Sequence, residues 1–238
     1  MHLKKVSLFP EKYPKTDRYP FNLEIFHQTE GVEFSTPTTF FTGENGTGKS
    51  TLLRAIAHRC GIYIWQNCDR RRFEQNPYEE LLYRFIDLEW TSGVVQGSLF
   101  GSDIFSDFTR LLDEWAAASP EVLTYFGGKS LITQSHGQSL MSYFRSRFTI
   151  KGIYLLDEPE TALSPKRQLE LLKILQETAQ AGHAQFIIAT QSPILISCPG
   201  ATIYSFDSSP LRNVAYRETD LYRGYRDFFA SSEGTGPR

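Results

Sequence analysis

The chain has 238 residues, of which 40% are hydrophobic and 22% charged, and its formal net charge is −2. This length is sufficient for one large domain with a sizeable core, and the near-neutral charge gives no support for wholesale binding to nucleic acid or to an anionic membrane. No apolar run is long enough to cross a bilayer, and no secretory signal opens the chain. We therefore expect a cytoplasmic protein that is not inserted in a membrane.

The cysteines are three in number, at positions 60, 68 and 198. They show neither C-x-x-C spacing nor nearby ligand histidines, so we expect reduced thiols rather than disulfides or a zinc site.

The first twenty residues predict a strand followed by a surface excursion. Lys4–Phe9 alternates weakly, and Pro10–Pro20 is polar and punctuated by proline. Tyr13, Arg18 and Tyr19 are candidates for stacking on an adenine, because aromatic faces and guanidinium planes both accept a base. The alternative is that these side chains only pack the excursion onto the sheet.

A strand, a glycine-rich loop and a helix follow one another between residues 38 and 60. After a short strand expected at 31–34, the β-prone run at 38–42 leads into GENGTGKS at 43–50, which fits the P-loop pattern G-x-x-x-x-G-K-[ST]. Its glycines let phosphate oxygens approach the backbone, and the helix that follows adds the positive end of its dipole. We expect Lys49 to reach the β- and γ-phosphates of a nucleotide and the Ser50 hydroxyl to bind Mg²⁺. The predicted nucleotide contacts are Gly43, Glu44, Asn45, Gly46, Thr47, Gly48, Lys49, Ser50 and Thr51.

The pattern is weaker from residue 62 to residue 149, which we interpret as an inserted lobe. It predicts helical pieces at 77–83 and 103–118 and strands at 85–90 and 93–95. The run Asp69–Arg72 is interpreted as a solvated cluster, with contact to a phosphate backbone as the alternative.

An apolar strand that ends in two carboxylates begins at Lys151. The sequence KGIYLLDEPE has Walker B form, so we expect Asp157 to lie beside Mg²⁺ and Glu158 to activate the attacking water. Adjacent carboxylates repel each other, so a purely structural role would be costly without a cation.

The last ninety residues predict further scaffold and one more site residue. A helix begins after Ser164, and a buried strand at 185–190 is followed by Gln191. Ligands bind at the carboxyl ends of parallel strands, so Gln191 is a candidate catalytic sensor of the γ-phosphate. The tail predicts strands at 201–205 and 213–216 and a helix at 221–229.

Together these elements predict an α/β P-loop fold with a mostly parallel central sheet, flanking helices and an inserted helical subdomain. The chain is expected to form a single domain, 1–238. Its nucleotide-binding core comprises residues 1–61 and 150–238.

The motifs in this order resemble those of ABC-type ATPases. GENGTGKST, QSHGQS, IYLLDEPETALSP and IIATQSP are similar to the soluble branch that contains the RecF and SMC heads. The likeness is greatest to small stand-alone bacterial proteins identified as predicted AAA-family ATPases, and it spans nearly the whole chain.

This resemblance implies a second half-site. Ser135, His136, Gly137 and Gln138 look like the signature that binds the γ-phosphate held by the opposite subunit, and residues 161–164 look like the D-loop at the interface. A serine and glycine amides at a helix N-terminus suit an anion. The implied partner is a second copy, in a homodimer formed on ATP binding.

The chain departs from the family pattern at three places. Gln191 stands where the family usually has histidine, His136 replaces a signature glycine, and the family's Q-loop glutamine is not clearly located, with Gln96 a weak candidate. Glutamine cannot become a cation near neutral pH, so turnover is expected to be slow. No sustained heptads occur, so we expect no coiled-coil arm.

The function expected from the sequence is hydrolysis of ATP to ADP and phosphate with Mg²⁺, with DNA or an effector as the candidate coupled partner. The alternatives are the ATP-binding subunit of a membrane transporter and a nucleotide-dependent switch with little turnover.

Overall fold

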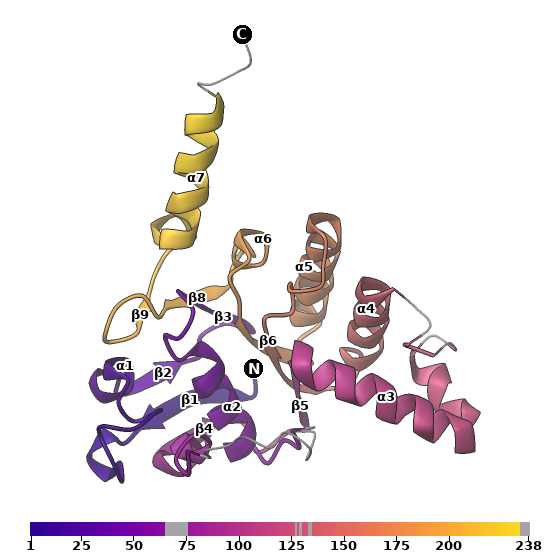
Figure 1. Ribbon diagram of the computed structural model, residues 1–238, viewed down its shortest axis with the longest axis horizontal. Coiled ribbons are helices and arrows are strands. Elements are labelled where there is room, and N and C mark those ends of the chain that lie inside the picture. Colours follow the sequence, from indigo (N-terminus) through magenta and orange to yellow (C-terminus); the bar gives the residue numbers. More distant parts are fainter. Residues whose placement is uncertain (65–75, 127, 129, 133–134, 234–238) are drawn as a thin grey trace.

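The computed structural model describes residues 1–64, 76–126, 128, 130–132 and 135–233. It contains a six-stranded sheet of order β5-β6-β7-β3-β8-β9 and a three-stranded sheet of order β2-β1-β4 (Figure 1). The strands are β1 Leu3–Leu8, β2 Gly31–Glu33, β3 Thr38–Thr42, β4 Ile86–Trp90, β5 Gly97–Gly101, β6 Gly152–Asp157, β7 Ala184–Ala189, β8 Thr202–Ser205 and β9 Arg212–Asn213. The α-helices are α1 Glu24–Gln28, α2 Lys49–Arg59, α3 Ser102–Ala118, α4 His136–Arg147, α5 Pro165–Gln180, α6 Pro193–Ile196 and α7 Asp220–Glu233. Short 3₁₀ segments are η1 Pro10–Lys12, η2 Leu81–Phe85, η3 Pro120–Phe126 and η4 Tyr216–Glu218.

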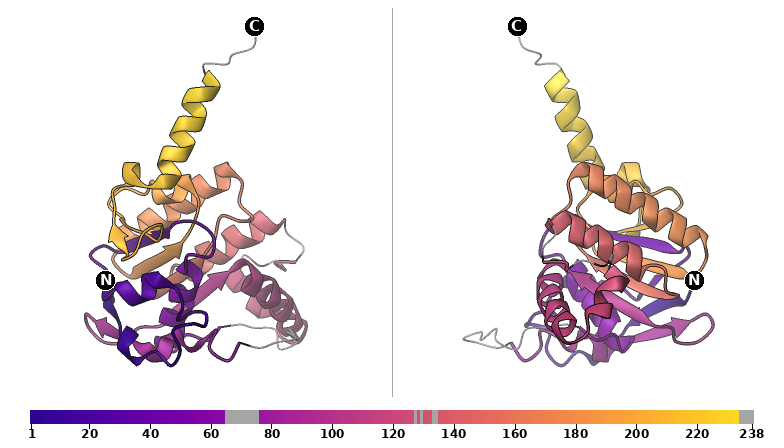
Figure 2. Two further views of the ribbon diagram at one scale, coloured as in Figure 1. Left: turned by 60° about the vertical axis from the view of Figure 1, so that its left-hand side comes forward. Right: turned by 90° about the vertical axis from the view of Figure 1, so that its right-hand side faces the viewer.

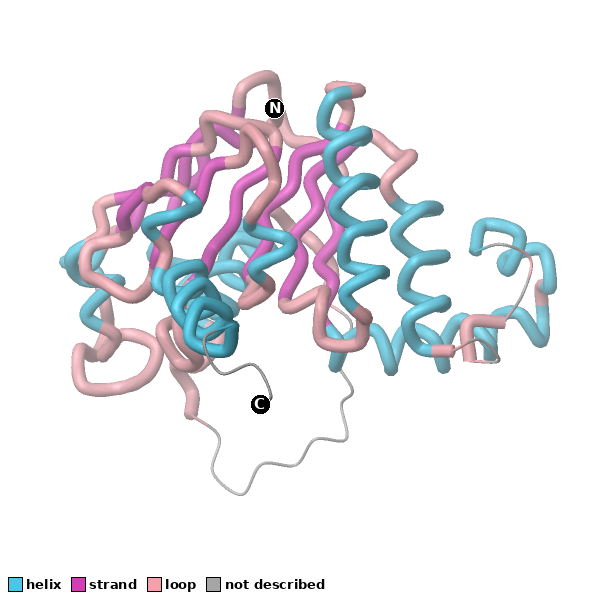
Figure 3. Tube along the Cα trace, turned by 90° about the horizontal axis from the view of Figure 1, so that it is seen from above, coloured by secondary structure: helices cyan, strands magenta, loops and turns pink. Residues whose placement is uncertain are grey.

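The large sheet is parallel except for β9. β6 pairs with β7 from Gly152↔Ala184 to Asp157↔Ala189, and β3 pairs in parallel with β7 and β8. The carboxyl ends of these strands therefore meet at one edge, where the P-loop follows β3 (Figure 3). The predicted α/β class with a mostly parallel sheet is confirmed.

Both faces of the large sheet are buried, which explains its almost continuous apolar strands. In β6, Ile153 and Leu155 belong to a core that includes α2 and the small sheet, whereas Tyr154 and Leu156 belong to a second core with α4, α5 and α6. The helices of this second core cover the opposite face of the sheet (Figure 2). α2 is thus held between two sheets, and its N-terminus is fixed at the edge described above.

One buried side chain joins the two sheets. Gln185 of β7 accepts hydrogen bonds from the backbone N–H groups of His2 (2.7 Å) and Leu3 (2.8 Å) through Oε1, and its Nε2 donates to the Leu3 carbonyl (2.8 Å). Its side chain is fully buried, so all three bonds form away from water.

Several predicted boundaries differ from the structure. The strand expected at 93–95 is wrong, because Gly93 has φ +95° in the turn after β4 and the strand forms at Gly97–Gly101 instead. The helical piece expected at 77–83 is the 3₁₀ segment η2, and the strand at 213–216 is only Arg212–Asn213. Asp69–Arg72 and Cys68 lie outside the described residues.

The range 62–149 contains strands of both sheets as well as helices. β4 pairs antiparallel with β1, and β5 pairs in parallel with β6, while α3, η3 and α4 form the part to the right in Figure 1. Treating the whole range as one inserted lobe stays a prediction. Within the described part of the chain, no helix has the combination of length and apolarity needed to span a bilayer.

Candidate functional site

The loop between β3 and α2 has a backbone that only glycine adopts easily. Gly43 has φ +141° and Gly48 has φ +103°, both in the left-handed region. A Cβ added to Gly48 would lie 2.8 Å from Cζ of Phe26, and one added to Gly43 would lie 2.9 Å from Oδ1 of Asp207. Both positions therefore need glycine for backbone conformation and for space.

Lys49, the first residue of α2, is folded back over this loop. Its side chain is buried, and Nζ donates hydrogen bonds to the carbonyl oxygens of Gly43 and Glu44, each at 2.6 Å. Burial lowers the pKa of Lys49, and the carboxylates of Glu158, Asp207, Asp157 and Glu44 oppose that shift. The ammonium group is thus held at the mouth of the loop, among carboxylates.

The first turn of α2 and the end of β6 are joined by a hydrogen bond from Ser50 to Asp157. Ser50 Oγ donates to Asp157 Oδ1 at 2.7 Å, and Arg54 Nε of α2 lies 3.9 Å from Asp157 Oδ2. The predicted metal ligands, 107 positions apart in the sequence, are therefore adjacent. Hydroxyl and carboxylate oxygens suit Mg²⁺, which takes one or two protein carboxylates and fills its other positions with water and phosphate. The described residues contain no cluster of three or more His, Cys, Asp or Glu side chains that could hold a metal.

Glu158, directly after β6, has an unusual backbone conformation. Its φ is +47°, the only positive value among the described residues other than glycine. Its N–H donates to the carbonyl of Ala189 at 2.9 Å, so β7 holds it in place. Such strained positions cost on the order of 1 kcal/mol and concentrate at functional sites, where the surrounding structure enforces them.

Gln191 is held at the end of β7 by a second acidic residue, Glu160. Glu160 Oε1 accepts hydrogen bonds from Thr190 Oγ1 (2.6 Å) and from the Gln191 N–H (2.7 Å). The Gln191 side chain donates through Nε2 to Asn45 Oδ1 of the P-loop. The predicted sensor and the P-loop are thus in direct contact. Burial raises the pKa of Glu160 despite these bonds, and its Oε2 is buried with no hydrogen-bond partner in the described structure.

The signature residues lie elsewhere in the same chain. Ser135 precedes α4, and its N–H donates to Oε1 of Gln138 (3.2 Å), so the Gln138 side chain caps its own helix. Gly137 packs against the loop after β6, since an added Cβ would lie 3.3 Å from the Ala162 carbonyl oxygen. His136 is the first residue of α4. In Figure 1, α4 lies beyond α5, toward the β5 end of the large sheet, whereas the P-loop joins β3 to α2.

The aromatic residues of the N-terminal excursion have different environments. Tyr13 is buried, with its OH bonded to the Phe26 carbonyl (3.1 Å) and its ring centroid 4.7 Å from that of Phe21, so it packs the core. Tyr19 is exposed, and its OH forms a hydrogen bond with Thr51 Oγ1 at the start of α2. Arg18 is also exposed. Of the three, Tyr19 has a contact with the P-loop helix.

The structure places Gln96 away from these residues. It precedes β5, whose first residue pairs with Ile153, whereas Asp157 pairs with Gly101 at the other end of the strand. At roughly 3.3 Å per residue, Gln96 is more than 10 Å from the carboxyl edge along the strand. As a Q-loop candidate it is therefore wrong.

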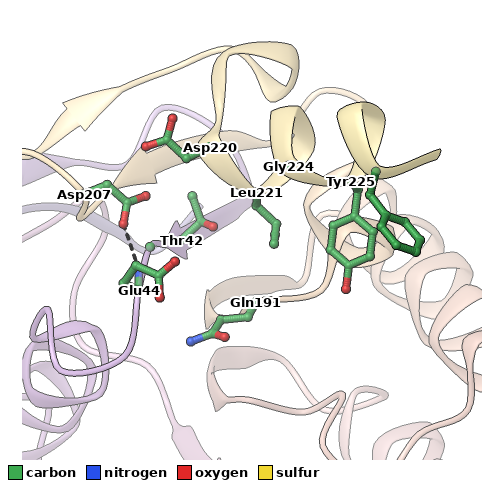
Figure 4. A pocket seen from close by; sticks show the side chains of 10 residues that line it. Thr42, Glu44, Gln191, Asp207, Asp220, Leu221, Gly224 and Tyr225 are labelled. Carbon is green, nitrogen blue, oxygen red and sulfur yellow. Dashed lines mark hydrogen bonds between the residues drawn. The ribbon is translucent and has the colours of Figure 1, made fainter. Parts of the chain in front are cut away.

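Asp207 is a site residue that the sequence analysis missed. It follows β8, and its Oδ1 accepts a hydrogen bond from the Glu44 N–H (2.8 Å), which fixes the first turn of the P-loop. The available signal was its position just after a strand of the parallel sheet, the same signal that identified Gln191. Asp207 also lines a hollow of about 480 Å³ together with Thr42, Gly43, Glu44, Gln191, Asp220, Leu221, Gly224, Tyr225 and Phe228 (Figure 4).

Comparisons with known proteins agree with this geometry. Residues 21–61 match a family model described as "AAA domain", and residues 138–197 match one described as "AAA domain, putative AbiEii toxin, Type IV TA system". The structure is similar to one described as "an inward-facing conformation of a putative metal-chelate type ABC transporter", with a TM-score of 0.53 and 17% identity over 94% of this chain and 88% of that chain. The chain therefore has a P-loop ATPase fold of the ABC type.

Two other solved structures resemble this chain at lower scores. The SMC head domain from Thermotoga maritima has a TM-score of 0.47 and 16% identity, covering 90% of this chain and 100% of that chain. CbiO1 from Clostridium perfringens, part of the ABC transporter complex cbiONQ, has a TM-score of 0.47 and 16% identity, covering 97% and 94%. A search of curated proteins found no match.

Proposed function

We propose that this P-loop ATPase binds ATP with Mg²⁺, hydrolyses it to ADP and phosphate, and works as a dimer that encloses two ATP molecules. The hydrogen bond between Ser50 and Asp157, beside the buried Lys49, is the observation that carries the proposal. It unites two motifs separated by about a hundred residues at the carboxyl edge of a parallel sheet, which is where such folds bind nucleotides.

In this proposal the loop binds the triphosphate through its backbone. The N–H groups of residues 44–50 and the positive end of α2 surround the phosphates, and Lys49 exchanges its bonds with the Gly43 and Glu44 carbonyls for phosphate oxygens. Ser50 and Asp157 hold Mg²⁺, which when bound neutralises charge on the β- and γ-phosphates. Tyr19, beside Thr51, is positioned toward the base end of the nucleotide.

Glu158 is the proposed general base. As a water oxygen attacks the γ-phosphorus, Glu158 accepts the water proton, and the bond from that phosphorus to the β–γ bridging oxygen breaks to release ADP. Its backbone bond to Ala189 keeps the carboxylate at the end of β6. Gln191, anchored by Glu160, orients the γ-phosphate or the attacking water.

The second copy completes each site in this proposal. Ser135 and Gly137, at the N-terminus of the twelve-residue helix α4, would contact the γ-phosphate held by the other chain. Their location away from the P-loop of their own chain supports a role in trans, and Gly137 lies against the Ala162 backbone of the predicted D-loop.

One observation favours a second function, a nucleotide-dependent switch with little turnover. Gln191 hydrogen-bonds Asn45 but cannot carry a positive charge near neutral pH, so it stabilises the developing charge less well than histidine. Coupling to DNA, to an effector or to a transporter rests on no residue described above, and the net charge of −2 does not favour nucleic acid.

Calorimetry with ATP and magnesium, followed by phosphate release, tests the proposal. We expect Lys49→Ala to abolish detectable ATP binding, and the exposed Lys151→Ala, which also removes one positive charge, to bind as the parent does. Glu158→Gln should bind ATP, release no phosphate and accumulate as a dimer in size-exclusion chromatography with light scattering. ATP binding that is equal in the parent and Lys49→Ala would refute the proposed site, and phosphate release by an intact Glu158→Gln variant would refute the proposed base.

A further inference from the structure

The C-terminal helix α7 projects from the body of the molecule, as Figures 1 and 2 show. Its first turn is anchored: Thr219 Oγ1 accepts a hydrogen bond from the Tyr222 N–H (3.1 Å), and the rings of Tyr216 and Tyr222 are 4.9 Å apart. Beyond this turn, Tyr225, Phe228 and Phe229 are 45%, 63% and 56% exposed. We call these three residues the aromatic face of α7.

The aromatic face lies on one side of an amphipathic helix. Leu221, Tyr225, Phe228 and Phe229 are spaced i, i+4, i+7 and i+8, which places them along one stripe. The opposite side carries Arg223, Arg226, Asp227 and Ala230. Exposed contiguous aromatic surface of this kind marks an interaction site on a water-soluble molecule.

This face begins where the proposed ATP site ends. Leu221, Gly224, Tyr225 and Phe228 form one wall of the 480 Å³ hollow, and Gly43 and Glu44 of the P-loop with Gln191 form its floor (Figure 4). A molecule that contacts the P-loop from outside the chain therefore also meets α7.

We propose that a second copy of the chain covers the aromatic face of α7 when two copies close on ATP. This inference rests on the proposed function, because the P-loop and Gln191 are the surfaces that the second copy approaches there. A different protein bound in the hollow would contact Gly43, Glu44 and Gln191, the same residues that the second copy approaches.

The aromatic face suits contact between identical chains because it carries no charged side chain. The charges of this part of the helix pair with one another away from that face, Asp220 with Arg223 (3.6 Å) and Arg226 with Asp227 (2.8 Å). In a two-fold dimer the same patch occurs on both chains, and an uncharged patch can face its own copy without like-charge repulsion.

The size of the face indicates why closure would need ATP. The three rings expose about 300 Å² in one copy, taking about 200 Å² as the area of an aromatic side chain. Two copies then contribute about 600 Å², roughly half of the 1,200 Å² at the lower limit of stable interfaces. The aromatic face therefore adds to an ATP-bridged interface but does not suffice for a dimer alone.

Two matched substitutions on α7 test the inference. In the Glu158→Gln protein, Phe229→Asp places a charge in the aromatic face at a residue that does not line the hollow, and Ala230→Asp places the same charge on the opposite side of the helix. We expect Phe229→Asp to raise the dissociation constant of the ATP-bound dimer by about 100-fold or more, because each copy loses a buried ring, whereas Ala230→Asp should change it less than about threefold. Light scattering across a concentration series with ATP and magnesium measures the dimer, and calorimetry of the monomer should give the same ATP affinity for both variants.

The outcomes separate this inference from the proposed function. If the ATP-bound dimer forms equally well with Phe229→Asp, the role of α7 is overturned while the ATP-bound dimer stands. If the Glu158→Gln parent stays monomeric although it binds ATP, the dimer and the role of α7 are both overturned. Loss of the dimer in Phe229→Asp alone, with ATP affinity unchanged, supports the inference.

Discussion

Removal of the Glu160 carboxylate gives the sharpest test of how the end of β7 is held. Glu160 accepts hydrogen bonds from the Thr190 hydroxyl and the Gln191 N–H, and Thr190 is fully buried. In Glu160→Ala both donors lose their acceptor, and each unpaired buried group costs about 1–3 kcal/mol. Glu160→Gln keeps a carbonyl oxygen at the same place, and its new NH₂ group replaces an oxygen that already lacks a partner.

The expected loss of unfolding free energy is therefore about 2–4 kcal/mol for Glu160→Ala and under about 1 kcal/mol for Glu160→Gln. For a chain of this size the first corresponds to a fall in Tm of about 4–16 °C. Urea denaturation of the parent and both variants measures the difference. Equal destabilisation by the two substitutions would show that the hydrogen bonds to Glu160 do not hold Thr190 and Gln191.

The pH dependence supplies a second readout. Burial raises the pKa of Glu160 above 4.5, with hydrogen bonds from Thr190 and Gln191 opposing the shift. The folded protein therefore binds more protons at this group than the unfolded chain does once the pH exceeds about 4, so ionisation lowers stability as the pH rises. The parent should lose stability relative to Glu160→Gln as the pH rises from about 4 through the folded pKa. A difference between the two proteins that stays constant from pH 4 to pH 7 would contradict this linkage.

Substitutions at three further residues test individual contacts. Tyr19→Ala should weaken ATP binding about tenfold and Tyr19→Phe by less than about threefold if the ring stacks on the base; equal small effects in calorimetry would exclude stacking. Asp207→Ala should weaken ATP binding about tenfold because the Glu44 N–H loses its acceptor, whereas Asp207→Asn keeps an acceptor and removes a negative charge near the phosphates, so it should bind ATP at least as well as the parent. A loss of affinity that is the same in both Asp207 variants would mean that the charge, not the hydrogen bond, matters. Gln191→His should increase phosphate release, more at pH 6 than at pH 8, because imidazole gains its proton in that range; a rate that is unchanged at both values would remove Gln191 from the proposed mechanism.

The P-loop and the end of β6 could be predicted because a short stretch of sequence specifies each of them. The glycine spacing before Lys49 and the apolar run before Asp157 each specify a short segment, and the rules of parallel sheets then place both segments at one edge. The hydrogen bond between Ser50 and Asp157 agrees with that reasoning.

The contacts between distant elements were not predictable in the same way. Nothing near Glu160 in sequence indicates that it would anchor residue 191, and nothing near Asp207 indicates that it would hold the first turn of the P-loop. Both contacts depend on strand order in the sheet. Tyr13 is a different case. Its local sequence allowed either stacking on a base or packing onto the sheet, and only its contacts with the surrounding aromatic rings show that it packs.

The three buried hydrogen bonds of Gln185 have a mechanical consequence. They join the small sheet to the large one at β7, the strand that precedes Gln191, so a hinge between the sheets would have to break all three bonds out of contact with water. We therefore expect the two sheets and α2 to move as one rigid body. A displacement of the large sheet during a chemical step at its carboxyl edge would then also move α3, α4 and the projecting α7.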